Sequence, residues 1–267
     1  ILRCLVGSEM CIRDSVQPVG DISLWKTEPF QPKMIDGRLF GRGSGDNKSG
    51  VVVHYNVIKQ LIDELPVNIK VFIEGEEEIG SPTMSDFIEQ NREALEADVI
   101  IIADSANVKI GVPTITTTLR GLVDGFIEVD QPMRPVHSGM GGGIVPDAFM
   151  VLSKIIASFH DDEGNLTIQG LTPTDMNVAE LDESYTKKML GSEDINLFGT
   201  ESISKRLWLE PALDVLAIDA PPVEEAVNLV IPKAKAKISL RLPPTEDPEH
   251  AMKMLEEHVM SLSLIHI

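Results

Sequence analysis

The apolar positions in the first half of the chain follow two different periods. Residues 51–65 carry apolar side chains at helical spacing, which predicts an amphipathic helix. Residues 67–74, VNIKVFIE, and residues 97–104, ADVIIIAD, are continuous apolar runs of strand length and predict two buried strands. Between them, residues 82–95 predict a second helix with Ser81 as its N-cap. This alternation is typical of an α/β fold with a mostly parallel sheet flanked by helices.

The pattern changes in the second half of the chain. Residues 119–131, LRGLVDGFIEVDQ, alternate like a half-exposed strand, and residues 228–242, NLVIPKAKAKISLRL, do so again. Residues 145–160 and 248–260 have helical periodicity. Two strands and two helices in this order predict a separate α+β domain.

The two ends of the chain do not read like protein sequence. Residues 9–15 and 262–267 can be encoded by DNA strings that are reverse complements over their overlap, as in a transposon-type sequencing adapter. We therefore interpret residues 1–15 and 262–267 as non-native and expect the gene to be cut at both ends. A partial first domain over residues 16–117 and an incomplete second domain over residues 118–261 remain.

Charge and cysteine usage narrow the class of protein further. The 267 residues carry a formal net charge of -19, which argues against nucleic acid and anionic membrane as partners. No run of eighteen or more apolar residues occurs, so no transmembrane helix is predicted. The two cysteines, Cys4 and Cys11, both lie in the N-terminal segment interpreted as non-native. The rest of the chain has neither disulfides nor thiolate metal sites, which fits a cytoplasmic location.

Four carboxylates fall where the predicted strands end. Asp46 ends a glycine-rich loop before a helix, Glu77 and Glu78 follow one buried strand, and Asp104 ends the next. The carboxyl ends of parallel strands meet at one edge of a sheet, so these side chains are expected to converge there. Carboxylates bind divalent cations, and one of two adjacent glutamates can accept a proton instead. Taken alone, the acidic cluster also fits a solvated turn.

Six motifs in one order carry a family resemblance over residues 16 to about 260. They are VQP with LWKTEPF, DGRLFGRGSGDNKSG, VFIEGEEEIGSP, ADVIIIADS, LRG with HSGMGGG, and VIPKAKAKISLRLPP. Together they resemble the dinuclear zinc metallopeptidases, a family that includes carnosinase-like dipeptidases, glutamate carboxypeptidase, aminoacylase, acetylornithine deacetylase and succinyl-diaminopimelate desuccinylase. The dipeptidase branch is the most similar. The resemblance implies a catalytic α/β domain with an inserted α+β lid and dimerisation domain.

The resemblance also implies a role for each carboxylate. Asp46 would bridge two divalent metal ions, Glu78 would bind one of them and Asp104 the other. Zinc is the expected metal, with manganese or cobalt as alternatives. Glu77 would be the general base that deprotonates an activated water and passes the proton to the leaving amine. Asn47 stands where the family usually has aspartate, and the bridging ligand itself is retained.

Two further residues are implied to contact the substrate. His137, in HSGMGGG, matches the lid histidine that reaches the partner subunit's active site and stabilises the developing oxyanion, which implies a homodimer. Arg241, in ISLRL, matches the residue that binds the terminal carboxylate of the substrate, for which a planar guanidinium is suited. The implied substrate is a dipeptide or an N-acyl amino acid.

Two histidine ligands of the family are missing from this sequence. The first belongs to a His-x-Asp motif directly before Val-Gln-Pro, and those positions are Arg13 and Ser15 here. The second lies in a C-terminal segment that follows the lid domain in the family. Three of five protein ligands remain, so we expect this polypeptide to bind metal poorly and to have no appreciable activity.

Other functions compete with dipeptide hydrolysis. An N-acyl-amino-acid deacylase would use the same metals and the same base, so it is the nearest alternative. A non-catalytic binding protein on the same scaffold is an alternative of another class, although retention of Glu77 argues against it. A phosphate-binding loop at GRGSGDNKS is disfavoured because Asn47 stands before Lys48, where such a loop needs glycine.

Overall fold

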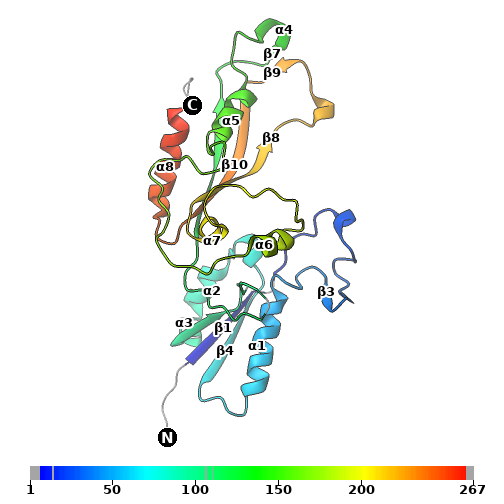
Figure 1. Cartoon of the computed structure of the whole chain (residues 1–267), viewed down its shortest axis with the longest axis vertical. Helices are drawn as coiled ribbons and strands as arrows, with labels where there is room; N and C mark the ends of the chain where they lie inside the picture. The colour runs from blue at the N-terminus through cyan, green and yellow to red at the C-terminus, as the bar shows by residue number, and fades with distance from the viewer. Residues whose placement is uncertain (1–6, 14, 106, 110, 263–267) are drawn as a thin grey trace. The chain divides into compact units, whose positions relative to one another are not determined.

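The computed structural model describes residues 7–13, 15–105, 107–109 and 111–262 (Figure 1). The chain divides into two compact units, one ending at Val112 and the other beginning at Pro113. Unit 1 contains a parallel sheet with helices, and unit 2 contains an antiparallel sheet with helices. The mixed α/β fold class predicted from the sequence is confirmed.

Three parallel strands form the main sheet of unit 1. The order is β4 (Asn68–Glu74), β1 (Gly7–Arg13) and β5 (Val99–Ile102), so β1 is the central strand. Both neighbours run parallel to β1, with Arg13 opposite Glu74 and Cys11 opposite Ile102. Because all three strands point the same way, the loops that follow β4 and β5 leave from one edge of the sheet.

The N-terminal segment that we interpret as non-native contains a strand of the sheet. Gly7–Arg13 pairs along its whole length with β4. A parallel strand in the centre of a sheet has hydrogen-bonding partners on both sides, which explains how a segment without a clear strand pattern is held there. The origin of residues 1–15 remains a prediction, as does that of residues 262–267.

The helices of unit 1 begin close to the predicted positions. α1 (Lys48–Leu61) starts at Asn47, whose side-chain oxygen accepts a hydrogen bond from the Gly50 amide at 3.2 Å. The second predicted helix is two short ones, α2 (Met84–Gln90) and α3 (Arg92–Leu95). Ser81 does not cap α2, which corrects the prediction, because its hydroxyl instead donates to the Glu74 carboxylate.

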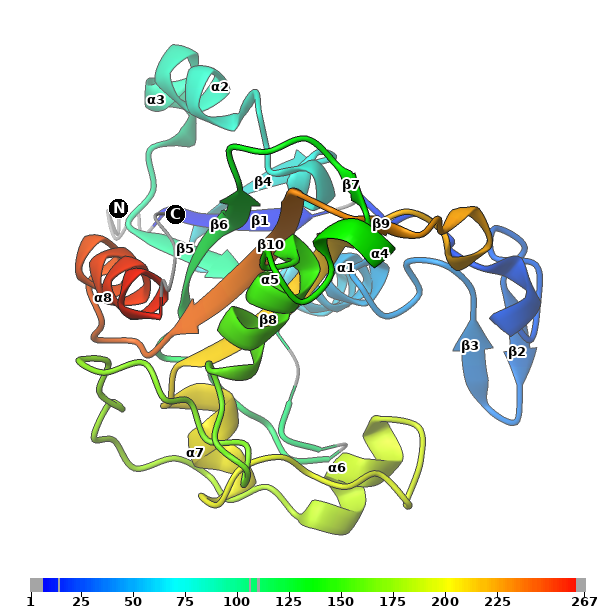
Figure 2. The ribbon, with the colours of Figure 1, turned by 90° about the horizontal axis from the view of Figure 1, so that it is seen from above.

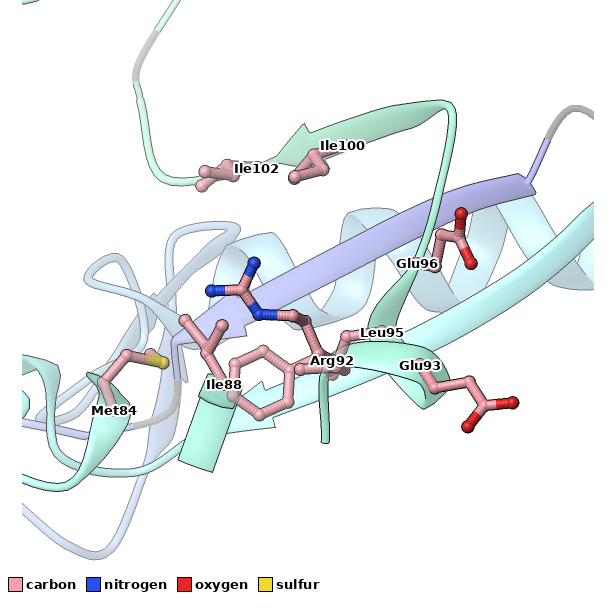
Figure 3. Close-up of a pocket in the computed structure, with 9 residues that line it drawn as sticks. Met84, Ile88, Arg92, Glu93, Leu95, Glu96, Ile100 and Ile102 are labelled. Atoms are coloured by element: carbon pink, nitrogen blue, oxygen red, sulfur yellow. The ribbon is translucent and has the colours of Figure 1, made fainter. Parts of the chain in front are cut away.

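The β5 strand is exposed in the structure, although its apolar sequence predicts a buried strand. Val99, Ile100, Ile101 and Ile102 retain 46–63% of their accessible surface. β5 is an outer strand of the three-stranded sheet, and its side chains border an open apolar groove beside α2 and α3. Figure 3 shows Ile100 and Ile102 across this groove from Ile88, Arg92 and Leu95.

Unit 2 is built on a three-stranded antiparallel sheet covered on one face by two helices. The strands are β6 (Gly121–Asp130), β10 (Lys233–Leu242) and β8 (Ala212–Asp219), with β10 in the centre. The helices α5 (Ala148–Ala157) and α8 (Pro248–Ser261) pack on β6, and α5 also packs on β10 (Figure 2). β6, α5 and α8 confirm elements predicted for this half, whereas β8 was not predicted.

The core of unit 2 lies between that sheet face and the two helices. On β10 the residues alternate between buried and partly exposed, as the KAKAKISLRL pattern predicts. Its buried side chains meet apolar residues of both helices, and the principal members are Leu152, Ile155, Phe159, Ile238, Leu240, Leu242, Ala251 and Leu255. The opposite face of the sheet carries charged side chains.

Residues 228–242 form two strands rather than the single predicted one. β9 (Leu229–Val230) pairs with β7 (Val136–His137), and β10 begins after Pro232. Proline has no amide hydrogen, so it interrupts the ladder between the two strands. The Pro232 carbonyl still accepts a hydrogen bond from the Gln131 amide at 3.0 Å.

The remaining elements are short. They are η1 (Ile22–Leu24), β2 (Lys33–Ile35), β3 (Arg38–Phe40), η2 (Glu77–Ile79), α4 (Ser138–Gly141), α6 (Glu183–Met189), α7 (Ile203–Trp208) and η3 (Val223–Glu225). Among the residues that the structure describes, no helix has the length and apolar character needed to cross a membrane.

Candidate active site

The four predicted carboxylates follow the carboxyl ends of strands or precede a helix in unit 1. Glu77 and Glu78 begin η2, shortly after β4 ends at Glu74. Asp104 follows β5, and Asp46 directly precedes the Asn47 cap of α1. Because β4 and β5 run parallel to the same central strand, the glutamates and Asp104 leave from the same edge of the sheet.

A close backbone approach holds the Asp46 turn against the end of β5. The Gly50 backbone at the start of α1 lies so near Ala103 that an added Cβ would overlap the Ala103 carbonyl oxygen. Asn47 is buried, and its side chain caps the same helical turn. The Asp46–Asn47 peptide bond is cis. Glycine at position 50 therefore lets the turn that carries Asp46 pack beside the residue that precedes Asp104.

Hydrogen bonds fix the glutamate-rich turn after β4. The Glu76 carboxylate accepts from the Thr83 hydroxyl at 2.6 Å and from the Thr83 amide at 3.2 Å. The Glu78 amide donates to the Ser15 hydroxyl at 2.9 Å, and the Gln17 side-chain amide donates to the Glu78 carboxylate. The segment just after β1 thus contacts Glu78 directly.

The sequence analysis assigned no site role to Gln17. The motif VQP marks the family resemblance, but nothing in its composition indicates which side chain Gln17 contacts. Ser15 occupies one position of the expected His-x-Asp motif, and the structure places it against the Glu78 backbone. The position at which the family's metal-binding motif is expected is therefore adjacent to the glutamate predicted to bind metal.

Carboxylates are suitable ligands for divalent cations, but the described side chains do not form a metal-binding group. Glu77, Glu78 and Asp104 are half-buried, and Asp46 is exposed. Within the described residues, no set of three or more His, Cys, Asp or Glu side chains is gathered closely enough to hold a metal ion. The structure brings these residues to one region of unit 1, and their ligand roles remain predictions.

His137 lies in unit 2 at the junction of β7 and α4. Its Nδ1 accepts a hydrogen bond from the Gly139 amide at 3.1 Å, and the side chain is exposed. A neutral histidine with Nδ1 as acceptor carries its proton on Nε2, so the outward nitrogen is a donor. This tautomer suits the oxyanion role that the resemblance implies, which stays a prediction.

Arg241 lies on the solvent-exposed face of β10. It stands opposite Leu122 on β6 and Ala212 on β8, so neither directly opposite residue is acidic. Of the residues that the structure describes, none forms a hydrogen bond or ion pair with its guanidinium. An exposed guanidinium without an internal partner is available to bind a carboxylate.

Comparison with known proteins identifies the family. A model described as "Peptidase family M20/M25/M40" matches residues 13–260. The cysteinylglycine-S-conjugate dipeptidase of Corynebacterium striatum is 35% identical over 251 residues, covering 91% of this chain and 55% of that protein. The human β-Ala-His dipeptidase is 30% identical over 260 residues, covering 91% of this chain and 51% of that protein.

A solved structure has the same architecture. The M20 family metallo-carboxypeptidase of Sulfolobus solfataricus matches with a TM-score of 0.79 and 29% identity, over 100% of this chain and 64% of that chain. This chain spans about half the length of the curated relatives that it matches. The family match nevertheless covers nearly all of the described residues, and the chain belongs to peptidase family M20/M25/M40.

Proposed function

We propose that the protein containing this chain is a metal-dependent dipeptidase that hydrolyses the amide bond of dipeptides or short peptides. The observation that carries the proposal is the position of Asp46, Glu77, Glu78 and Asp104, which the α1 turn and the loops after β4 and β5 bring to one region of unit 1. The dipeptidases of Corynebacterium striatum and human among its relatives support this substrate class.

Three of these carboxylates would hold the metal. Asp46, Glu78 and Asp104 would hold two divalent cations, and zinc is the proposed ion. Bound cations would polarise the substrate carbonyl and make a nearby water more acidic. The Gln17 amide and the Ser15 hydroxyl hold the Glu78 side chain and backbone, so they orient this ligand.

Glu77 and His137 would move protons and stabilise charge. Glu77 would accept a proton from water on a carboxylate oxygen and then deliver it to the leaving amine. The Nε2–H of His137 would donate to the oxyanion in the active site of the partner subunit, which makes the proposed enzyme a homodimer. These roles do not require His137 to lie near Glu77 within one subunit.

The residues at positions 13 and 15 are the reason why we propose little activity for this polypeptide. They stand where the family's His-x-Asp motif is expected, so one imidazole ligand is replaced by a cationic side chain. A guanidinium stays protonated and has no lone pair to offer a metal ion, so it cannot take the place of an imidazole ligand. We therefore propose that the 267-residue chain binds metal poorly and has no appreciable activity.

Substrate tests on the full-length parent protein separate the competing functions. The substrates are dipeptides such as β-alanylhistidine and N-acetyl amino acids, each assayed with zinc, manganese or cobalt supplied. Faster hydrolysis of the dipeptides supports the proposal, and faster hydrolysis of the N-acetyl amino acids supports a deacylase. Turnover of neither class would reject both enzymes and leave a binding protein on this scaffold.

A further inference from the structure

A cavity of about 320 Å³ in unit 2 is lined by two opposite charges that do not pair with each other. Arg206 lies on α7, and Glu210 lies between the end of α7 and the start of β8. Both residues line the cavity. Among the residues that the structure describes, no hydrogen bond or ion pair joins the guanidinium to the carboxylate. The two charges therefore border one cavity without neutralising each other directly.

The Arg206 side chain is fixed through one nitrogen and keeps its other donors. Its Nε donates a hydrogen bond to the Glu201 carbonyl at 2.7 Å, which holds the half-buried side chain in place. The two terminal nitrogens form no hydrogen bond with any residue in the described part of the chain. A guanidinium that is held in this way can offer its remaining N–H groups to a carboxylate in the cavity.

The environment of Glu210 disfavours its negative charge. Burial raises the pKa of the Glu210 carboxyl, the nearby charge of Glu201 raises it further, and two basic neighbours offset part of this effect. The carboxylate accepts no hydrogen bond from the residues that the structure describes. A half-buried carboxylate without donors is stabilised in its charged form when a cationic group binds beside it. Asp214 on β8 is a second carboxylate at this cavity, and it is exposed.

The rest of the cavity wall is apolar or is already hydrogen-bonded. Phe159 and Leu213 are buried core residues that line it. The His160 ring packs edge-on to Phe198 with ring centroids 5.0 Å apart, and burial lowers the pKa of His160, which favours its neutral form. The Asn165 side chain has partners for both its amide donor and its carbonyl. Arg206 is therefore the cation of this cavity, and the apolar wall can contact a small side chain.

We propose that this cavity binds a free α-amino acid, whose carboxylate contacts Arg206 and whose ammonium group contacts Glu210. Only a zwitterion satisfies both charges, because an anion leaves Glu210 unpaired and a cation leaves Arg206 unpaired. The volume of about 320 Å³ lies at the lower end of the range of roughly 300–1,000 Å³ for small-molecule sites, which suits one amino acid. The role of the site rests on the dipeptidase function proposed above, since free α-amino acids are the products of dipeptide hydrolysis.

Calorimetry on the 267-residue chain tests the site without any need for hydrolysis. The probes are L-leucine, N-acetyl-L-leucine, which lacks the ammonium group, and L-leucinamide, which lacks the carboxylate. L-leucine is expected to bind roughly tenfold or more tightly than either analogue, as for one hydrogen bond to a charged group. The backbone amides of Gly164 and Gly199 line the cavity, so their ¹H–¹⁵N NMR signals are expected to shift with L-leucine. Absence of L-leucine binding, or equal binding of the three probes, would overturn the proposal.

Glu210→Gln removes the proposed partner of the ammonium group while nearly preserving the size of the side chain. It is expected to weaken binding of L-leucine roughly tenfold or more and to leave binding of N-acetyl-L-leucine unchanged, because that analogue has no ammonium group. Glu201→Gln is the matched control, since it removes a nearby negative charge that already pairs with Lys205 at 3.0 Å. It is expected to bind L-leucine like the unaltered chain. Equal losses in the two variants would contradict the assigned contact.

Assays of the parent protein separate this inference from the proposed function. If the parent protein hydrolyses dipeptides but L-leucine leaves the Gly164 and Gly199 signals unchanged, the amino-acid site is rejected and the dipeptidase proposal stands. If the parent protein hydrolyses no dipeptide but L-leucine still shifts these signals, the dipeptidase proposal fails. The amino-acid site then stands, and its interpretation as a site for reaction products is rejected.

Discussion

Neighbouring glutamates after β4 have different structural roles. Glu76 is fixed by two hydrogen bonds from Thr83, and Glu78 receives the Gln17 amide. Glu77 lies between them as the first residue of η2 and is half-buried. A carboxylate held by a rigid turn on both sides can keep a defined position for proton transfer, because its neighbours restrict the backbone.

Replacing Glu77 tests its role as the base. Glu77→Gln in the parent protein is expected to lower kcat by about 10²- to 10⁴-fold, since an amide cannot accept the proton. Metal content, measured by atomic absorption, is expected to remain unchanged. The control is Glu76→Gln, whose carbonyl can still accept from Thr83, and it is expected to retain turnover. Similar losses in the two variants would remove the special role assigned to Glu77.

Residue types that carry candidate chemistry can be recognised in a sequence, whereas contacts between distant residues cannot. Acidic residues at strand ends predict Asp46, Glu77, Glu78 and Asp104 as a group. The structure places them after β4 and β5 and before α1, but among the described residues no three potential ligands lie close enough to hold a metal ion. The part played by Gln17 could not be predicted, because its contact with Glu78 joins residues 61 positions apart.

At the scale of elements, the junction of α1 with β5 determines where the Asp46 turn lies. Gly50→Ala would place a methyl group against the Ala103 carbonyl, so the helix or the strand end must shift. Overpacking of this kind costs about 1–3 kcal/mol of unfolding free energy. Urea unfolding followed by circular dichroism measures this loss.

Gly45→Ala is the matched control for that experiment. It adds the same methyl group in the same loop, but no atom lies within 4 Å of the added Cβ. Its unfolding free energy is expected to stay close to that of the unaltered chain. Equal stability of the Gly50→Ala and Gly45→Ala variants would show that the close approach of α1 to Ala103 is not required.

Local sequence signals predict elements whose start is marked by capping residues. The start of α8 is encoded by Asp247 and Pro248, a side-chain cap and a helix-starting proline, so residues 248–260 are predicted almost as observed. The exposure of β5 was not predicted, because apolar composition indicates a preference for burial without specifying what covers the strand. The parallel position of β1 also depends on long-range pairing, which no local pattern shows.

The packing of α8 predicts a pH dependence of stability. His258 on α8 contacts the Ser158 hydroxyl through Nε2 at 2.9 Å, and the centroids of the His258 and Phe159 rings are 5.5 Å apart. Burial lowers the pKa of His258, and a hydrogen bond that the ring makes to the Ser158 backbone offsets part of this effect. The folded state disfavours the protonated ring, so the neutral His258 ring contributes to the free energy of unfolding. This contribution is fully present above the unfolded pKa of about 6.5 and is lost as pH falls through the lower folded pKa.

Thermal unfolding between about pH 5 and pH 8 measures this contribution. The midpoint temperature is expected to fall as the pH decreases below about 6.5, and His258→Gln is expected to reduce that slope. Burial lowers the pKa of His160 as well, so the single variant should leave part of the slope in place. An unchanged slope in His258→Gln would assign the pH dependence to other groups.

At the scale of the whole molecule, the family match covers most of the chain, whereas the set of metal ligands is incomplete among the described residues. The match covers residues 13–260, yet the chain spans about half the length of its curated relatives. The two units each retain a sheet and helices of the fold, whereas the described residues gather no metal-binding group of three. A recognisable peptidase fold is thus present without a complete set of converging ligands, so fold and activity require separate tests.

The position of β1 suggests that substitutions at its end can restore the expected metal-binding motif. Arg13 is the last residue of this central strand, and Ser15 already contacts the Glu78 backbone. The double variant Arg13→His, Ser15→Asp would supply an imidazole ligand and an acidic residue that can orient it. Zinc binding by the 267-residue chain, measured by isothermal titration calorimetry, is expected to tighten by at least about tenfold, since second-shell support alone changes affinity on that scale.

A third substitution shows whether the gain uses the predicted carboxylates. Adding Asp104→Asn to the double variant removes one predicted ligand while nearly preserving its size, so the gain in zinc affinity should be lost. Asp98→Asn is the control for general charge, because Asp98 precedes β5 at its opposite end. If both aspartate variants retain the gain, the new histidine binds zinc without Asp104. If the double variant binds no tighter than the original chain, positions 13 and 15 are not those of the missing motif.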